Sequence, residues 1–205
     1  AFCDEYERTG IINYEAMRAY PSMLFGIETA VAQFNAKGSL NFFDTPFGRG
    51  EEGILINGLV WMGTIDEMFE RLEAKLKAGF RCIKIKIGAI DFDRELQLIR
   101  HIRSTFSRND VELRVDANGS FTPKEALSRM EALVQYDIHS IEQPIKQHQW
   151  AEMARLCAAT PLPIGLDEEL IGVNERQKKI ELLDTIRPQY IVLKPSLHGG
   201  MAGTK

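Results

Sequence analysis

From residue 54 onwards, short apolar runs alternate with longer segments whose apolar positions recur every three or four residues. The short runs are typical of buried parallel strands, and the longer segments are typical of amphipathic helices. This alternation predicts a parallel α/β fold. Its strands are expected at residues 54–62, 82–87, 111–116, 139–143, 163–167 and 190–194.

Signals for the ends of helices support this alternation. Thr64 and Glu67, and then Thr122 and Glu125, form capping-box patterns that open helices directly after strands. Ahead of the first strand, residues 13–38 are predicted to be helical, and residues 41–52 look like a connection rich in proline and glycine.

Three consecutive predicted strands end in a carboxylate, on Asp116, Glu142 and Asp167. They are spaced by about one strand-plus-helix unit, so the three should lie at the same end of neighbouring strands. In a barrel of such units, that end carries the chemistry. Converging carboxylates repel one another unless a cation lies between them, and ligation by oxygen alone suits Mg²⁺. The alternative is that each carboxylate caps the helix that follows it.

Three lysines occupy positions where a core would be expected. Lys84 and Lys86 alternate with isoleucines in the second strand, so both should face the barrel interior. Burying two ammonium groups is costly unless anions lie nearby, and the three carboxylates supply them. Lys194 ends the sixth strand, which lies across an eight-stranded barrel from the second. Two amines facing each other suit removal of a proton next to a substrate carboxylate.

The composition narrows the class of protein. The 205 residues are 44% hydrophobic and 26% charged, with a formal net charge of −4, which gives no basic footprint for nucleic acid or an anionic membrane. No apolar run approaches the roughly 18 residues that span a bilayer, and no signal peptide opens the chain. Cys3, Cys82 and Cys157 are far apart and are interpreted as buried thiols of a cytoplasmic protein.

The number of strands leaves two architectures open. Six strands could form an open doubly wound sheet, although the first one lacks a glycine-rich phosphate fingerprint. A barrel closes with about eight strands, so on that interpretation about two lie outside these residues.

The motifs together resemble the enolase superfamily, in its muconate lactonizing enzyme subgroup. Residues 116–121 and 193–200 look most like the o-succinylbenzoate synthase family of menaquinone biosynthesis, and residues 25–30 look like the helix that precedes the barrel. The superfamily motifs are K-x-K at residues 84–86, V-D-A-N at 115–118, I-E-Q-P at 141–144, L-D-E at 166–168 and a strand-ending lysine at 194.

The resemblance implies a TIM-type (β/α)7β barrel, here strands 1–6 at residues 53–205, preceded at 1–52 by the end of a capping domain and a linking helix. It implies a small carboxylate substrate and Mg²⁺ on Asp116, Glu142 and Asp167. Lys86 would remove the α-proton and then protonate the departing hydroxyl, giving syn elimination of water. Lys194 would stabilise the intermediate and Lys84 would be an electrostatic helper. Groups that orient the ligands would be Asn118 and Glu168.

Two other functions stay open from the sequence. The same scaffold supports isomerases, namely an N-acylamino acid racemase, a dipeptide epimerase or a muconate cycloisomerase. The chain could also be a non-catalytic fragment that needs further residues to fold.

Overall fold

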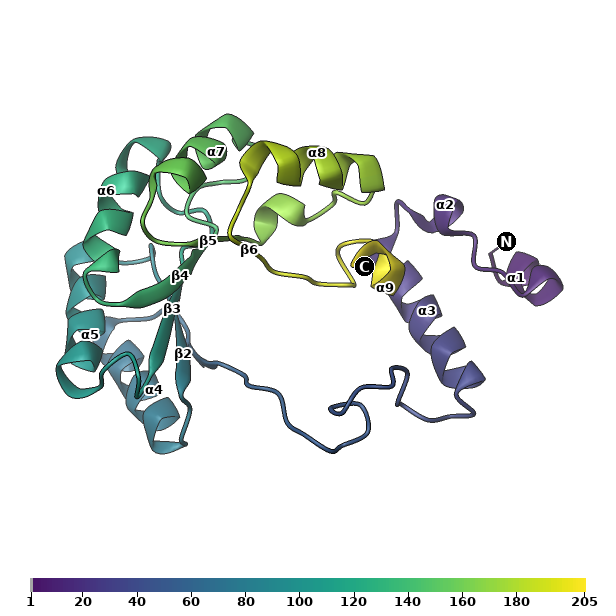
Figure 1. The fold of residues 1–205 in the computed structure, drawn as a ribbon, viewed down its shortest axis with the longest axis horizontal. Coiled ribbons are helices and arrows are strands. Elements are labelled where there is room, and N and C mark those ends of the chain that lie inside the picture. The colour runs from purple at the N-terminus through teal and green to yellow at the C-terminus, as the bar shows by residue number, and fades with distance from the viewer. Residues whose placement is uncertain (1) are drawn as a thin grey trace. The chain divides into compact units, whose positions relative to one another are not determined.

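The computed structural model describes residues 2–205, which divide into two compact units. The first unit comprises residues 2–54, 170–180 and 193–205, and the second comprises residues 55–169 and 181–192. Figure 1 shows their elements in chain order. The expected division at residue 52 into a capping remnant and a barrel stays a prediction.

The second unit is built on a six-stranded parallel sheet, as the sequence predicted. Its strand order is β1-β2-β3-β4-β5-β6, so each strand pairs with its neighbour in the sequence. A doubly wound sheet would reverse this order at a switch point, so the order identifies part of a barrel. The strands are β1 (Gly58–Val60), β2 (Cys82–Lys86), β3 (Glu112–Asp116), β4 (Ile138–Glu142), β5 (Ile164–Leu166) and β6 (Tyr190–Ile191).

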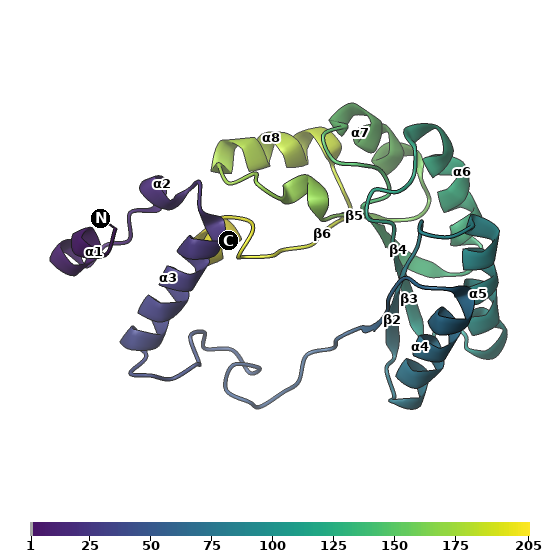
Figure 2. The same cartoon turned by 180° about the vertical axis from the view of Figure 1, so that it is seen from behind.

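Helices follow the strands and cover one face of this sheet (Figures 1 and 2). Ile83, Ile85 and Ile87 of the second strand region are at most 1% exposed, so apolar burial holds this layer together. Both predicted capping boxes are present, at Thr64 and Thr122. The helices of this unit are α4 (Ile65–Lys77), α5 (Phe92–Thr105), α6 (Pro123–Val134), α7 (Trp150–Ala159) and most of α8 (Arg176–Ile186).

The two outer strands are shorter than predicted. The strand expected at residues 54–62 is reduced to Gly58–Val60, and the one expected at 190–194 ends at Ile191. Among the described residues, β1 pairs with β2 alone and β6 with β5 alone. The apolar residues that flank β1 and β6 can therefore form backbone hydrogen bonds with one neighbouring strand at most. Lys194 consequently lies beyond the last strand rather than at its end.

The first unit begins with α1 (Phe2–Thr9), α2 (Tyr14–Met17) and α3 (Pro21–Asn35). Residues 13–38 were predicted to be helical, and most of them are, but the stretch is divided into α2 and α3 because the chain leaves the helical conformation at Tyr20, directly before Pro21. A residue before proline is disfavoured in the α region. The short α9 (Gly200–Gly203) packs against α3, where the Glu28 carboxylate accepts hydrogen bonds from the backbone N–H groups of Met201 and Ala202.

Two further findings concern the expected surface chemistry. No helix in residues 2–205 is long and apolar enough to cross a membrane. All three cysteines are free thiols, but the prediction that all are buried is wrong, because Cys3 is exposed and Cys82 is half-buried. Cys3 lies on α1, which has no buried residue to pack a thiol against.

Candidate functional site

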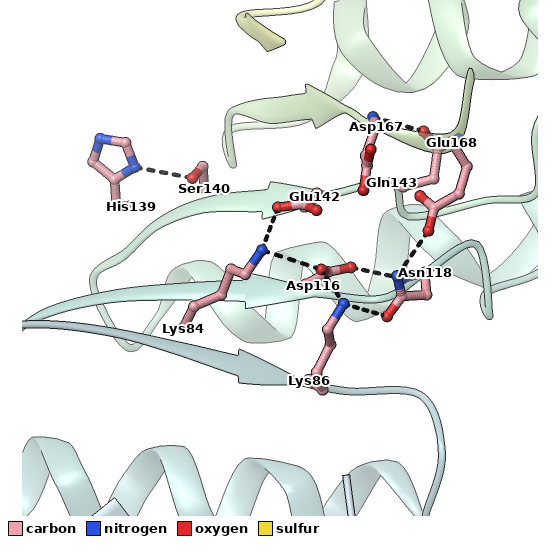
Figure 3. Close-up of polar contacts among 10 residues, drawn as sticks. All are labelled: Lys84, Lys86, Asp116, Asn118, His139, Ser140, Glu142, Gln143, Asp167 and Glu168. Atoms are coloured by element: carbon pink, nitrogen blue, oxygen red, sulfur yellow. Dashed lines mark hydrogen bonds and ion pairs between the residues drawn. The ribbon is translucent and has the colours of Figure 1, made fainter. Parts of the chain in front are cut away.

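Two lysines of β2 meet the carboxylates of the next two strands (Figure 3). The Nζ of Lys86 lies 2.5 Å from Oδ2 of Asp116, and the Nζ of Lys84 lies 2.9 Å from Oε2 of Glu142. Lys84 also lies 3.4 Å from Oδ2 of Asp116. The sheet therefore carries a partly buried network of two ammonium and two carboxylate groups on the face opposite the isoleucines.

Strand register explains why these groups meet. Lys86 is the direct partner of Asp116 in the β2–β3 ladder, and Asp116 is the direct partner of Glu142 in the β3–β4 ladder. Residues at the same level of neighbouring parallel strands point to the same face of the sheet. The alternating sequence of β2 thus places both of its lysines beside the strand ends.

Asp167 follows β5, one strand further along the sheet, and is 2% exposed. In Figure 3 its side chain points towards the strand end that carries Glu142. Its position depends on Gln143, a fully buried residue that sequence reasoning missed. Oε1 of Gln143 accepts hydrogen bonds from the backbone N–H groups of Asp167 at 3.1 Å and Glu169 at 3.2 Å. The only sequence signal for this role of Gln143 was its amide side chain directly after Glu142 at the end of β4.

The network shifts the pKa values of its members in opposite directions. Burial, together with the neighbouring Asp116 charge, raises the pKa of Glu142 to about 7. Burial alone would also raise the pKa of Asp116, but hydrogen bonds from Lys86 and Glu142 lower it. Burial opposes the charge of Lys84, yet its bonds to Glu142 and Asp116 raise its pKa overall. Of the two carboxyl groups, Asp116 therefore stays ionised more readily and Glu142 takes up a proton more readily.

The chemistry of the carboxylate donors suits a hard divalent cation, since three carboxylates follow three adjacent strands. As the side chains stand, no group of three or more His, Cys, Asp or Glu residues within residues 2–205 could hold a metal ion. The ammonium groups of Lys84 and Lys86 instead contact the oxygens of Asp116 and Glu142. The residue types fit Mg²⁺, while Asp116 and Glu142 are paired with the two lysines.

Asn118 connects this network to the next loop. Its Oδ1 accepts a hydrogen bond from Lys86 at 2.8 Å, and its Nδ2 donates to Oε1 of Glu168 at 2.7 Å. Its backbone N–H also donates to Oδ1 of Asp116 at 3.0 Å. Asn118 has a φ of +45° and Gly119 one of +71°, so a left-handed turn brings the amide back over the strand end. Glu168 contacts the site through Asn118.

Lys194 belongs to the first unit, whereas the network lies in the second. Its backbone N–H donates to Nδ1 of His198 at 3.1 Å, and His198 is 2% exposed. The structure thus brings Lys84, Lys86, Asp116 and Glu142 into direct contact. The role of Lys194 in the site is inferred from the sequence.

Comparison with known proteins defines the class to which this fold and site belong. Residues 67–205 match the family described as enolase C-terminal domain-like. The chain therefore belongs to this family, within the enolase superfamily, as its motifs indicated.

The similar proteins include a synthase and an epimerase. The chain is 53% identical over 181 residues to the o-succinylbenzoate synthase of Desulfotalea psychrophila, covering 88% of this chain and 49% of that protein. It is 32% identical over 142 residues to the L-Ala-D/L-Glu epimerase of Bacillus subtilis, covering 68% and 38%. The crystal structure of MenC from D. psychrophila aligns with a TM-score of 0.72 and 42% identity, over 99% of this chain and 60% of that one. The chain spans about half the length of the curated relatives that it matches.

Proposed function

We propose that this chain carries the catalytic lysines and the metal-binding carboxylates of a Mg²⁺-dependent o-succinylbenzoate synthase in menaquinone biosynthesis. The observation that carries the proposal is the contact of Lys86 with Asp116 at the ends of neighbouring strands. It occurs in a chain that is 53% identical to a synthase of this name. The substrate is a small carboxylate, and the free thiols support a cytoplasmic setting.

Asp116, Glu142 and Asp167 would hold Mg²⁺ with carboxylate oxygens, as this ion prefers. When bound, the ion supplies a Lewis acid that polarises the substrate carboxylate and so makes its α-proton more acidic. Asn118 orients Asp116 by donating its backbone N–H to Oδ1. Gln143 fixes the backbone of Asp167 from the neighbouring strand end.

The chain's own residues then move the proton. The amine of Lys86 removes the proton on the carbon next to the substrate carboxylate, and the electron pair of that C–H bond stays with the substrate. The C–O bond to the hydroxyl group breaks, and Lys86 returns its proton to the departing oxygen from the same face, so that one water leaves. Lys84 keeps a positive charge between Asp116 and Glu142. We assign Lys194 the second cation, which stabilises the charge of the intermediate.

A second candidate is an epimerase on the same scaffold. The observation that favours it is the 32% identity to an L-Ala-D/L-Glu epimerase. In that reaction Lys86 and Lys194 would act as bases from opposite faces of the α-carbon, and no hydroxyl would leave.

The full-length protein with Mg²⁺ separates these candidates. It should convert the hydrated precursor of o-succinylbenzoate into that aromatic product, followed by NMR, and should lose this activity in the presence of a chelator. A panel of dipeptides and N-acylamino acids is assayed beside it. Turnover of the panel without dehydration of the precursor would replace the synthase by the epimerase.

A further inference from the structure

The loop after β1 holds a tryptophan whose place is set by a neighbouring helix. Nη1 of Arg71, on α4, donates to the backbone carbonyl oxygens of Trp61 at 3.0 Å and Met62 at 2.8 Å. A Cβ at Gly63 would lie 2.6 Å from the side-chain ends of Arg71 and Glu67, so these two side chains reach the loop. Arg71 therefore links the loop to α4 through two hydrogen bonds.

The ring of Trp61 contacts the ammonium of Lys86. Nζ of Lys86 lies 5.3 Å from the centroid of the indole ring, which is within cation–π range. The side chain of Lys86 also donates to Asp116 and Asn118, so its charge has two oxygen partners and one aromatic partner. Lys86 is 8% exposed although Trp61 itself is 55% exposed. A large aromatic ring at the surface thus lies against the one buried amine that the proposed reaction uses as its base.

We infer that Trp61 is a positioning residue for Lys86, which it holds in place through the face of its indole ring. The inference rests on the proposed role of Lys86 as the base. An unbranched lysine side chain has several rotatable bonds, and fixing its amine in a reactive geometry lowers the barrier to proton transfer. The hydrogen bonds to Asp116 and Asn118 fix the amine from the β3 side, and the indole ring fixes it from the β1 side. Arg71 extends this support by holding the loop that carries the ring.

Two other roles for an exposed tryptophan make different predictions. A ring that lines the substrate site without acting on Lys86 would affect substrate affinity, and hence KM. A ring that serves as an apolar contact for another segment of the protein would affect stability, and leucine would replace it well. A ring that acts through Lys86 needs a π face, which phenylalanine retains and leucine lacks.

The first test measures the contact itself and needs no activity. In the full-length protein labelled with 5-fluorotryptophan, the ¹⁹F resonance of Trp61 is the one that disappears in Trp61→Phe. Lys86→Met should shift this resonance. Lys75→Met is the matched control, because it removes an ammonium 5.4 Å from the ring of Phe80 in the same unit, and it should leave the resonance in place. A Trp61 resonance that responds equally to both variants would overturn the inference.

The second test measures the consequence on the α-proton. Trp61→Leu should lower the rate constant kcat by about three- to ten-fold with KM within about two-fold, and Trp61→Phe should restore most of the loss. The reaction followed is exchange of the α-proton with solvent deuterium, for whichever carbon acid the wild-type protein accepts. If that acid is a dipeptide, the proposed synthase function fails while the comparison of leucine with phenylalanine still decides the role of Trp61. An unchanged kcat in Trp61→Leu, or a change in KM alone, would overturn the inference.

Discussion

The Lys86 ammonium lies 2.5 Å from Oδ2 of Asp116, and the Lys84 ammonium lies 3.4 Å from the same oxygen. One carboxylate oxygen at the end of β3 therefore has two cationic neighbours from β2. Asp116 is fully buried, so these contacts replace the water that an exposed carboxylate would have. The Asp116 carboxylate is also one of the three that would hold Mg²⁺. Ammonium groups and the metal ion are thus expected to compete for Asp116.

The buried ion pairs should matter for stability. Asp116→Asn removes the charge that Lys84 and Lys86 share, and removal of one partner from a buried pair costs about 3 kcal/mol or more. The free energy of unfolding of the full-length protein, measured in urea, should fall by that amount. Glu152→Gln is the control, because it breaks a half-exposed bridge to Arg155 and should cost about 1 kcal/mol or less. Equal losses in the two variants would show that the network is not a buried charge pair.

Mg²⁺ affinity should depend on pH near neutrality. Glu142 has a pKa raised to about 7, so below that pH it binds a proton, which competes with the metal for the carboxylate oxygens. Affinity measured by calorimetry should therefore rise as pH increases, by about tenfold between pH 6 and pH 8. Glu142→Gln should bind Mg²⁺ more weakly and lose most of this pH dependence. An affinity in the wild type that stays constant across this range would contradict the assignment of Glu142 as a ligand.

Gln143 should support both the fold and the metal site. Gln143→Leu leaves the buried N–H groups of Asp167 and Glu169 without this acceptor, which should cost about 2 kcal/mol of unfolding free energy. Mg²⁺ affinity should weaken as well, because Asp167 loses the bond that fixes its backbone. Gln97→Leu, on the exposed side of α5, is the matched control and should change stability by about 0.5 kcal/mol or less. Unchanged metal affinity in Gln143→Leu would remove Gln143 from the account of the site.

The thiols should differ in reactivity according to their burial. Burial raises the pKa of Cys157 and of Cys82 to about 11, so little thiolate is present at pH 8, whereas Cys3 is exposed. Brief alkylation of the native protein, mapped by mass spectrometry of peptides, should modify Cys3 first. In urea the three should react at similar rates. If Cys157 of the native protein were modified as fast as Cys3, the packing of α7 would not bury the Cys157 thiol as described.

The sequence predicted the parallel sheet because alternation of strands and helices leaves a regular pattern of apolar positions. It also predicted that Lys84 and Lys86 face the carboxylates, since side chains of a strand alternate between its two faces. It overestimated the outer strands, because apolar identity alone does not supply a ladder partner. Leu55 was expected in the first strand and is 99% exposed.

Contacts between elements distant in the sequence could not be predicted in the same way. The hydrogen bonds of Gln143 to the loop after β5 depend on the register of β4 and β5. The contact of Trp61 with Lys86 depends on the pairing of β1 with β2. The pattern of apolar residues within one strand or helix does not predict contacts between side chains on different strands. The motifs therefore predicted the residues to which we assign the chemistry, while the contacts of Gln143 and Trp61 became visible only in the structure.

The central claim is that Lys86 is the base that removes the α-proton. It is tested most directly by NMR of α-proton exchange with solvent deuterium in Lys86→Ala and Lys194→Arg, each with Mg²⁺ binding measured in parallel. The account predicts that Lys86→Ala abolishes both exchange and elimination while Mg²⁺ binding is largely kept, and that Lys194→Arg retains a trace of activity because its cation survives. Exchange that switches with the handedness of the substrate between the two variants would identify a racemase. Exchange at the wild-type rate in Lys86→Ala would contradict the account.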